Sequence, residues 1–242
     1  MIKFFRNIRR SLLGEGKSAR YFKYAVGEIL LVMIGILLAL QVNNWNENRK
    51  AKQHEIKLAS QLLDDARADS IFFETRVNFQ KVRDTLFNHL IYFSNNRTSD
   101  SIAKKPVNAD PFFFRLAYQS NLISNNPDAY DIITNDTIKS KLREYKARYD
   151  YVVHSIELSN RIIEEYGFPL QIKYYEELKL LSGNVTIKDF AFIVDDMETI
   201  ALIEQFKSYG FNYLFQLERF LTSNQELIQL LEEYLNNNKR NN

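Results

Sequence analysis

The feature that most constrains this chain is an apolar segment near its N-terminus, Ala25–Val42, whose central part, Ile29–Leu40, carries no polar side chain. As a helix rising 1.5 Å per residue, the segment is just long enough to cross about 30 Å of hydrocarbon. Aromatic residues flank both ends, as they do at membrane interfaces. These residues are Tyr21, Phe22, Tyr24 and Trp45. The sequence therefore predicts a transmembrane helix over residues 24–43.

The distribution of charge favours this prediction over a buried core helix, which is the alternative because twelve strictly apolar residues are few for a span. The formal net charge is only +2. Residues 1–24 hold seven basic side chains against one acidic, a net +6, whereas the rest of the chain holds 25 basic against 29 acidic, a net −4. A strongly basic flank fixes a span with that flank in the cytoplasm.

A cleaved signal peptide is the next alternative, and it needs small residues just before the cleavage site. The stretch after the apolar core, Leu40–Trp45, has no such pair. We therefore expect an uncleaved signal anchor that crosses a membrane once, with its N-terminus in the cytoplasm. The expected divisions are a basic cytoplasmic segment (1–23), the transmembrane helix (24–43) and an extracytoplasmic helical domain (44–242), periplasmic in a Gram-negative cell.

The basic segment 1–23 has a pattern of its own. Ile2, Phe5, Ile8 and Leu12 recur at helical spacing among Lys and Arg. This pattern is typical of a short helix lying on the inner leaflet, with its cations near anionic lipid. A positively charged tail without fixed structure remains an equal alternative.

Residues 21–47 read YFKYAVGEILLVMIGILLALQVNNWNE, preceded by MIKFFR at 1–6 and EGK at 15–17. This stretch resembles the N-terminal signature of an uncharacterised family of single-span membrane proteins common in Bacteroidota. The match is specific over about residues 1–50 and looser beyond. The resemblance implies a bacterial inner-membrane protein with a helical extracytoplasmic domain. It implies no catalytic residues, because the family has no established activity.

The segment after the anchor is predicted to be helical. Asn46–Phe93 contains neither Gly nor Pro, which permits one long helix. Residues 94–111 are polar and interrupted by Pro, hence a loop. A short helix is expected over Phe112–Ile123, and Asn126–Pro127 has the residues of an N-cap followed by Pro at the first helical position.

A second long helix follows, ending near Gly167 and Pro169. Another helix is expected over Leu170–Leu181, and a last helical segment from about Ile187 to Leu235, with a break at Gly210. We predict an all-α fold: one N-terminal transmembrane helix followed by an elongated antiparallel helical bundle. The second long helix is predicted from apolar or small residues spaced by four and three, namely Ile138, Leu142, Tyr145, Tyr149, Val152, Ile156, Ser159 and Ile163.

The end of the last segment has the most regular heptad of the chain, which makes its residues candidates for helix pairing. A single Asn in such a seam typically fixes the register of the pair. Pairing within one chain is the favoured interpretation, and pairing between subunits is the alternative. The candidates are Leu214, Leu217, Leu221, Asn224, Ile228, Leu231 and Leu235.

The transmembrane segment carries one carboxylate, Glu28. Carboxylates in a membrane usually face a partner or a water-filled path, although Glu28 also lies near enough to the end to reach interfacial cations. Small residues spaced as Gly35 and Ala39 let two helices approach closely. The membrane-interface candidates are Glu28, Val32, Gly35, Ala39, Trp45 and Asn46.

No enzymatic chemistry is predicted. The three His residues are far apart in sequence, Cys is absent, and no Gly-rich phosphate loop or hydrolase motif occurs, so we expect no metal and no cofactor. Carboxylate pairs are predicted to lie on solvent faces, except that Asp195 and Asp196 also suit a helix N-terminus. The acidic body lacks the basic patch that nucleic-acid binding needs. The remaining carboxylates are Asp64, Asp65, Asp69, Glu164, Glu165, Glu232 and Glu233.

These features lead to three hypotheses. The first is a non-enzymatic interaction or scaffold module of an envelope assembly, contacting membrane lipid and a protein partner or a second copy. The second is a subunit of an energised membrane complex that uses Glu28. The third, weaker, is a periplasmic enzyme that uses clustered carboxylates.

Overall fold

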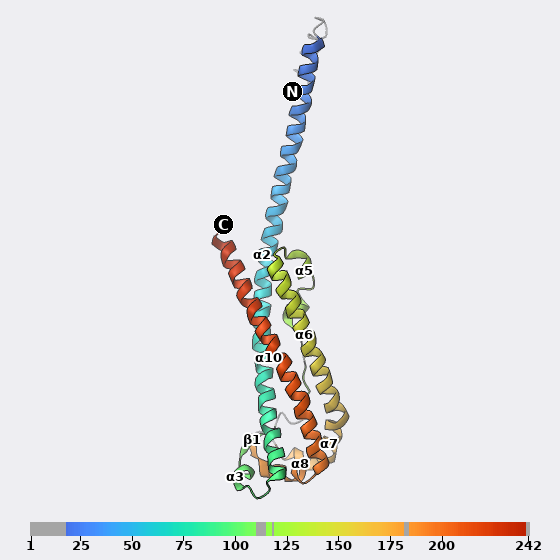
Figure 1. Ribbon diagram of the computed structural model, residues 1–242, viewed down its shortest axis with the longest axis vertical. Helices are drawn as coiled ribbons and strands as arrows, with labels where there is room; N and C mark the ends of the chain where they lie inside the picture. Colours follow the sequence, from blue (N-terminus) through green and yellow to red (C-terminus); the bar gives the residue numbers. More distant parts are fainter. Residues whose placement is uncertain (1–17, 110–114, 118, 182–183, 241–242) are drawn as a thin grey trace. The chain divides into compact units, whose positions relative to one another are not determined.

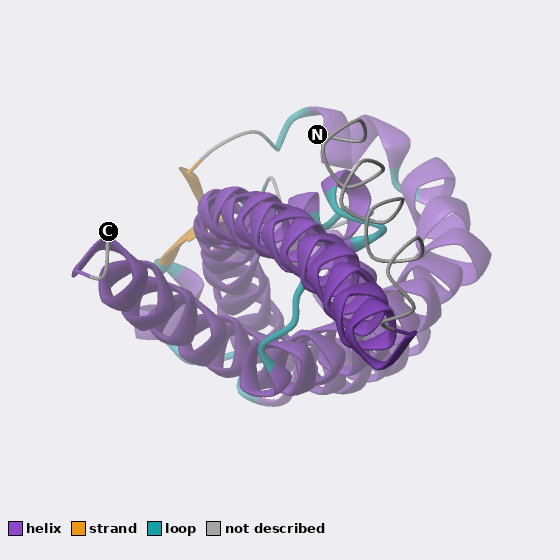
Figure 2. Cartoon of the chain, turned by 90° about the horizontal axis from the view of Figure 1, so that it is seen from above, coloured by secondary structure: helices purple, strands orange, loops and turns teal. Residues whose placement is uncertain are grey.

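The computed structural model describes residues 18–109, 115–117, 119–181 and 184–240. Residues 1–17 of the basic segment, with the predicted interfacial pattern of Ile2, Phe5, Ile8 and Leu12, lie outside the described residues. Most of the described chain is helical, with two short strands (Figure 2). The chain divides into two compact units, residues 1–54 and 55–242. Helix α2, Ser18–Asn95, contributes to both units.

Unit 1 consists, in its described part, of the first half of α2. None of the most apolar part of this helix is buried, and Ile29 and Leu31 each expose about two thirds of their surface. A core helix of a water-soluble protein would bury one face. This segment buries no face, and its length and composition would allow it to cross a membrane.

Unit 2 is built on three long helices that lie side by side in Figure 1. They are the second half of α2, α6 (Asp136–Ile162) and α10 (Met197–Arg240). None of them contains Pro, so no backbone donor is missing from a helix interior. The prediction of an all-α fold, in which a long apolar N-terminal helix precedes packed long helices, is confirmed.

Helices α2 and α6 run in the same direction, and α10 runs antiparallel to both (Figure 1). Glu55 of α2 accepts a hydrogen bond from Thr134, just before α6 begins, and Asp69, further along α2, accepts one from Tyr145. The parallel pair exists because residues 96–135 return to the beginning of unit 2 before α6 starts. That return is a feature that the sequence did not predict.

Two apolar cores fill unit 2. The first core is built around three aromatic rings in edge-to-face contact, with the Phe220 ring 4.7 Å from Phe73 and 4.9 Å from Tyr145. Such ring pairs add about 0.5–1.5 kcal/mol beyond the area they bury. The second core lies at the other end of the unit and includes Phe87 and Phe206, whose centroids are 6.4 Å apart.

Helix α6 has the predicted apolar stripe: all eight positions are buried except Tyr149, which is half-buried. Its predicted start was wrong. Asn126–Pro127 does not begin a helix; the N-cap is Asn135, whose side chain accepts a hydrogen bond of 3.0 Å from the N–H of Ile138. The helix does not stop at Gly167 either, because a π-helix, η1 (Ile163–Gly167), continues it into α7 (Phe168–Lys173).

In its described residues, the connection between α2 and α6 contains four short elements. These are α3 (Asp100–Ala103), β1 (Pro106–Asn108), α4 (Asn121–Asn125) and α5 (Ala129–Ile132). The predicted loop 94–111 therefore contains a turn of helix and a strand. The helix predicted over Phe112–Ile123 was only partly correct in its described part: residues 121–123 are helical, as the start of α4, whereas residues 115–117 and 119–120 are not.

The connection between α7 and α10 is similarly divided. It contains α8 (Tyr175–Lys179), β2 (Asn184–Thr186), the 3₁₀-helix η2 (Ile187–Phe190) and α9 (Ala191–Val194). Strand β2 pairs antiparallel with β1, with Val185 opposite Val107. Through this pairing, the connection between α2 and α6 contacts the connection between α7 and α10.

The predicted break at Gly210 was wrong, because α10 continues through it. Gly210 is buried where α10 meets α2, and a Cβ atom there would lie 2.2 Å from Nε2 of Gln80 and 3.3 Å from Oδ1 of Asp84. This glycine therefore permits a close approach of two helices rather than ending one of them.

Candidate functional site

The membrane-interface candidates except Trp45 lie along one face of the first half of α2, because steps of four and three residues return to the same side of a helix. Trp45 lies off this face, at the end of the apolar segment. Glu28 is half-buried, Val32 exposes 55% of its surface, and no side chain approaches Gly35 within 4 Å. Ala39 is exposed. Within unit 1, this face is available to lipid or to another helix.

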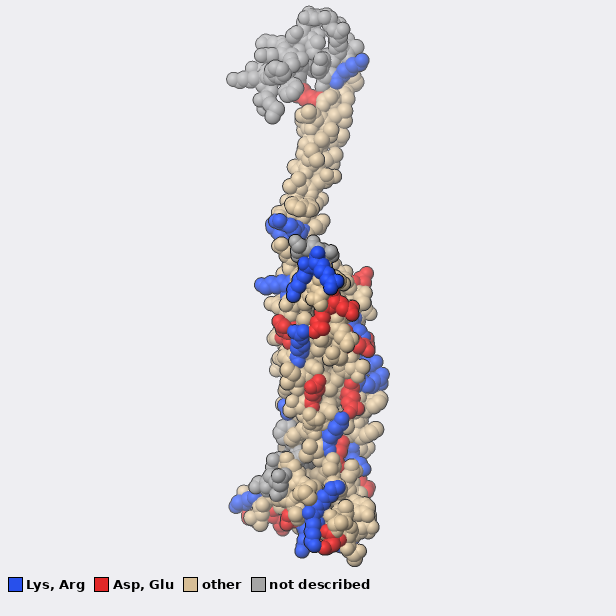
Figure 3. All heavy atoms as spheres, turned by 90° about the vertical axis from the view of Figure 1, so that its left-hand side faces the viewer, with Lys and Arg blue, Asp and Glu red and all other residues tan. Residues whose placement is uncertain are grey.

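The far end of the apolar segment is marked by a small cluster of polar and aromatic groups. The Arg49 guanidinium lies 5.4 Å from the centre of the Trp45 ring and donates a hydrogen bond of 3.5 Å to Oδ1 of Asn46. An indole beside a cation is the arrangement that proteins place at the headgroup level. Figure 3 shows the uncharged stretch of this helix between charged side chains at its two ends, and the sequence has no charged residue between Glu28 and Glu47.

In unit 2, Asp69 lies at the centre of a buried hydrogen-bond network. Its carboxylate accepts bonds from the hydroxyls of Tyr145 (2.5 Å) and Ser120 (2.7 Å) and from the N–H groups of Asn121 (2.7 Å) and Leu122 (3.2 Å). Burial, followed by the charge of Asp69, raises the pKa of the Tyr145 hydroxyl above its ordinary range. The prediction that Asp69 faces solvent was wrong, because its exposed surface is 0%.

Two more carboxylates of α2 hold the same connection. Glu55, also buried, accepts bonds from the N–H and hydroxyl of Thr134 and from the N–H of Asn135. The two oxygens of Asp65 accept bonds from the amides of Asn125 and Asn126. Glu55 and Asp65 therefore hold the connection between α2 and α6 against α2. These hydrogen bonds contribute to the fold of unit 2.

Asp195 and Asp196 lie at the start of α10, as the sequence allowed. Asp196 accepts bonds from the hydroxyl of Thr199 (2.7 Å) and the N–H of Glu198 (3.1 Å), which is an N-cap arrangement. Hydrogen bonds from Lys173, then Tyr174 and Thr199, hold the pKa of Asp196 well below its ordinary value. Asp195 pairs with Arg97, which lies just after α2, at 2.8 Å.

The helix-pairing candidates of α10 lie in or against the first core. Leu217, Ile228 and Leu231 are buried there. Nδ2 of Asn224 donates a bond of 2.8 Å to the backbone oxygen of Ala66 in α2, so this Asn joins two helices of the same chain. The other three, half-buried against the core, are Leu214, Leu221 and Leu235.

A polar layer, defined by Gln80, Arg83 and Asp84 of α2, lies between the two cores. Arg83 exposes 2% of its surface and donates a bond of 2.5 Å to Oε1 of Gln80, whose Nε2 donates a bond of 2.7 Å to Asp84. Burial lowers the pKa of Arg83 below its ordinary value and raises that of Asp84. A buried cation of this kind was not predicted from the sequence.

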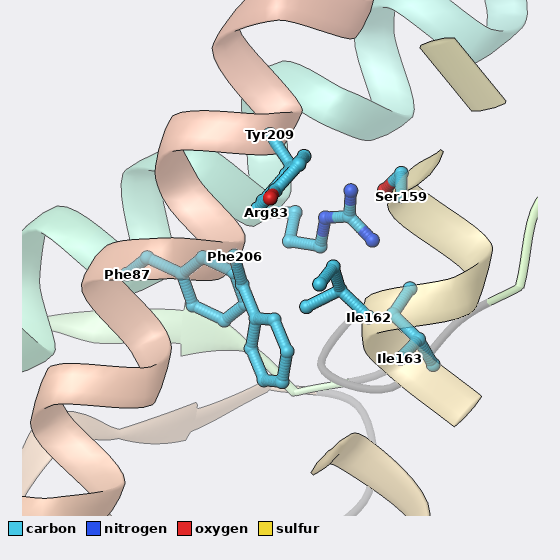
Figure 4. A pocket seen from close by; sticks show the side chains of 7 residues that line it. All are labelled: Arg83, Phe87, Ser159, Ile162, Ile163, Phe206 and Tyr209. Carbon is cyan, nitrogen blue, oxygen red and sulfur yellow. The ribbon is translucent and has the colours of Figure 1, made fainter. Parts of the chain in front are cut away.

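Beside Arg83 is a small hollow lined by all three long helices (Figure 4). The guanidinium of Arg83 points from α2 toward the hydroxyl of Ser159 on α6, and Tyr209 of α10 lies on the opposite side. The remaining walls are apolar. They are the side chains of Phe87, Ile162, Ile163 and Phe206.

His54 and His89 lie in α2, and His154 lies in α6. His54 and His154 are exposed, and Nε2 of His89 lies 2.8 Å from Nζ of Lys105. Burial, then the charge of Lys105, lowers the pKa of His89. Over the described ranges, no three His, Asp or Glu side chains are grouped so that they could hold a metal ion.

These observations define a helical protein in which a candidate single membrane helix precedes a bundle held together by buried polar contacts. Residues 28–205 match a family of unknown function, DUF6090, and the chain belongs to that family. The match extends from the apolar segment through most of unit 2. No curated protein and no solved structure matches the chain.

Proposed function

We propose that this chain is a single-span protein of a bacterial inner membrane whose helical unit 2 lies in the periplasm and acts as a non-enzymatic interaction or scaffold module of an envelope assembly. One observation carries the proposal: an apolar segment with no buried residue is followed along the chain by a unit whose buried carboxylates are engaged in internal contacts. The family resemblance of residues 1–50 to Bacteroidota membrane proteins supports the same placement.

The orientation rests on the charge at the two ends of the span. The +6 of residues 1–24 favours a cytoplasmic N-terminus, and the Trp45–Arg49 cluster suits the opposite headgroup region. Because the chain has no Cys, single cysteines can report this orientation without background. Ser60→Cys, at an exposed position of unit 2, is expected to react with a membrane-impermeant maleimide in intact cells.

The matched control is Ser11→Cys, in the basic segment, which is expected to react only after the membrane is permeabilised. The reverse pattern of labelling would contradict the proposed orientation. Equal labelling of both positions in intact cells would contradict a membrane span.

The proposed partner surface is the Glu28 face of unit 1. The heptad residues of α10 contact the first core of their own chain, so they are less suited to pairing between subunits. Small residues at 35 and 39 would let a second helix approach, either from another copy or from another membrane protein. Mild cross-linking in the native membrane, followed by identification of the captured chains, tests this. Recovery of the monomeric protein alone would count against an assembly role.

The second candidate function is a subunit of an energised membrane complex in which Glu28 takes part in proton movement. The observation that favours it is the position of this carboxylate within the apolar segment. Glu28→Gln is expected to abolish the function of the assembly, while Glu47→Gln, which lies outside the apolar segment and pairs with Lys50, leaves it intact. An unaltered phenotype in Glu28→Gln would remove this candidate.

A carboxylate-dependent enzyme is less well supported. The most buried of the clustered carboxylates, Asp69, already accepts four hydrogen bonds from the protein. Glu164 and Glu232 are partly exposed and pair with Arg115 and Arg67. A general acid or base needs a proton site open to substrate, which these internal contacts do not offer.

A further inference from the structure

The outer surface of α7 and α8 is apolar, whereas the outer surface of a helical bundle is normally polar. Phe168 and Ile172, one turn apart in α7, expose 37% and 79% of their surface. Tyr175 in α8 exposes 59%, and Leu180, directly after α8, exposes 81%. Large apolar side chains that gather on a surface in this way mark interaction sites.

These side chains are exposed although the same segment already has an inward apolar face. Leu170 is buried in the second core. Packed against that core are Tyr174, Leu178 and Leu181. A helix that only covers a core needs one apolar face and presents polar residues on the other. Residues 168–181 therefore have an apolar surface that packing within unit 2 does not use.

The start of α10 extends this surface. Asp196 accepts hydrogen bonds from Lys173 and from the hydroxyl of Tyr174, which hold the end of α7 against the start of α10. The next residue, Met197, exposes 66% of its surface. Figure 1 shows α7 and α8 at the end of unit 2 at which α10 begins. We call the exposed apolar side chains of this region the α7–α8 patch: Phe168, Ile172, Tyr175, Leu180 and Met197.

The charged residues among and beside this patch are mostly acidic. Residues 164–179 and 195–198 hold seven acidic side chains and two basic ones. Basic side chains pair with three of the seven, Glu164, Asp195 and Asp196. The surroundings of the patch therefore carry a net negative charge. The other four acidic residues are exposed and, in the described part of the chain, form no ion pair: Glu165, Glu176, Glu177 and Glu198.

We propose that the α7–α8 patch binds a basic amphipathic segment of a partner protein. Apolar side chains of that segment would cover Ile172 and Leu180, and its Lys or Arg side chains would pair with the exposed carboxylates. The acidic charge disfavours the two other occupants of an apolar surface. An anionic lipid surface would be repelled, and a second copy of the same patch would bring like charges together.

The inference rests on the proposed role of unit 2 as an interaction module, and it adds the surface and the chemistry of the partner. The test uses the full-length protein in nanodiscs of zwitterionic phosphatidylcholine, with empty nanodiscs as the blank. The probe is a fluorescein-labelled peptide of Leu and Lys with the spacing of an amphipathic helix, and its binding is followed by fluorescence anisotropy. We expect saturable binding that weakens as salt is added, and no binding of the matching peptide in which Glu replaces Lys.

Two kinds of variant separate the apolar contact from the charge. Ile172→Ser and Leu180→Ser should each weaken the affinity about tenfold or more, because an apolar side chain that the peptide would bury is lost. Glu176→Gln combined with Glu177→Gln should weaken it about threefold or more at low salt and reduce its dependence on salt. The matched control is Ile71→Ser, a similarly exposed apolar position of α2 outside the patch, which should bind the peptide as the wild type does.

Equal binding of the Lys and Glu peptides, or unchanged affinity in Ile172→Ser and Leu180→Ser, would overturn the proposal. So would association of the nanodiscs with phosphatidylglycerol vesicles, or with one another, that is lost in Ile172→Ser, because the surface would then belong to lipid or to a second copy. Maleimide labelling of Ser60→Cys and Ser11→Cys does not depend on any of these results. The envelope placement and this inference can therefore fail separately.

Discussion

Asp69 joins three parts of unit 2 through one carboxylate: its own helix α2, the start of α4 and the middle of α6. Its four donors include two backbone N–H groups from the first turn of a short helix, which have no acceptor within that helix. The start of α4 is therefore held in part by a side chain that is distant in sequence.

Replacing Asp69 by Asn should destabilise the protein by about 2–4 kcal/mol, because an amide of the same shape brings donors of its own to a site that needs an acceptor. Urea unfolding followed by circular dichroism measures this change. Asp64→Asn, on the exposed side of the same helix, is the control and should change the stability by less than about 0.5 kcal/mol. Equal effects of the two substitutions would mean that the buried network contributes little.

Asp196 should make stability depend on acid pH. Its folded-state pKa lies below the ordinary value of about 3.9, so its contribution is complete above that value and is lost as the pH falls through the folded-state pKa. At neutral pH, Asp196→Ala should cost about 1 kcal/mol through loss of the α10 N-cap. The difference in melting temperature between the wild type and this variant should shrink as the pH falls below about 4. A constant difference would contradict the assignment.

The burial of Asp69, Gln80 and Arg83 could have been predicted from their spacing in the sequence, but we did not predict it. Leu62, Ala66, Asp69, Phe73, Val77, Gln80, Arg83 and Phe87 follow one another at steps of four and three, so the polar members share the buried face. An interpretation that assigns charged residues to solvent misses them. The hydrogen-bond partners of these residues could not be predicted from the sequence, because Ser120 and Tyr145 come close to Asp69 only in the folded chain.

At the scale of elements, long helices were predictable and short ones were not. The steps of four and three in α6 predicted its buried face correctly, because the apolar period is a property of the helix alone. The starts of α4 and α6 depend instead on Asp69, Glu55 and the N-cap Asn135. Contacts across many residues therefore override the local signal of Asn126–Pro127.

A substitution at Gly210 tests the close contact between α10 and α2. In most helix interiors, replacing Gly by Ala stabilises by about 1 kcal/mol. Here the added methyl group would meet the end of Gln80, which is held by bonds to Arg83 and Asp84, so Gly210→Ala should destabilise by about 1–2 kcal/mol in thermal or urea unfolding.

The double variant Gly210→Ala with Gln80→Ala supplies the control. Without the Gln80 amide, the alanine has space, and adding Gly210→Ala to Gln80→Ala should be neutral or stabilising. If Gly210→Ala were equally destabilising in both backgrounds, contact with the backbone rather than with Gln80 would be the cause.

At the scale of the whole molecule, both apolar cores belong to unit 2, and the described part of unit 1 buries none of its most apolar segment. A fragment of residues 46–242 should therefore remain soluble without detergent and melt cooperatively, within a few degrees of the full-length protein in detergent. Circular dichroism and size-exclusion chromatography measure this. Aggregation, or loss of helicity, would mean that the fold of unit 2 depends on the apolar segment.

Helix α10 contributes side chains to both cores, as Phe220 does to the first and Phe206 to the second. Neither core can be completed until the ribosome has made residues 197–240, on the order of ten seconds after it finishes α2. During that interval, the apolar segment has already emerged, while the aromatic residues of α2 and α6 lack their neighbours. For a chain anchored as proposed, membrane insertion would precede folding, and the unfinished chain would need protection from aggregation in the compartment that receives unit 2.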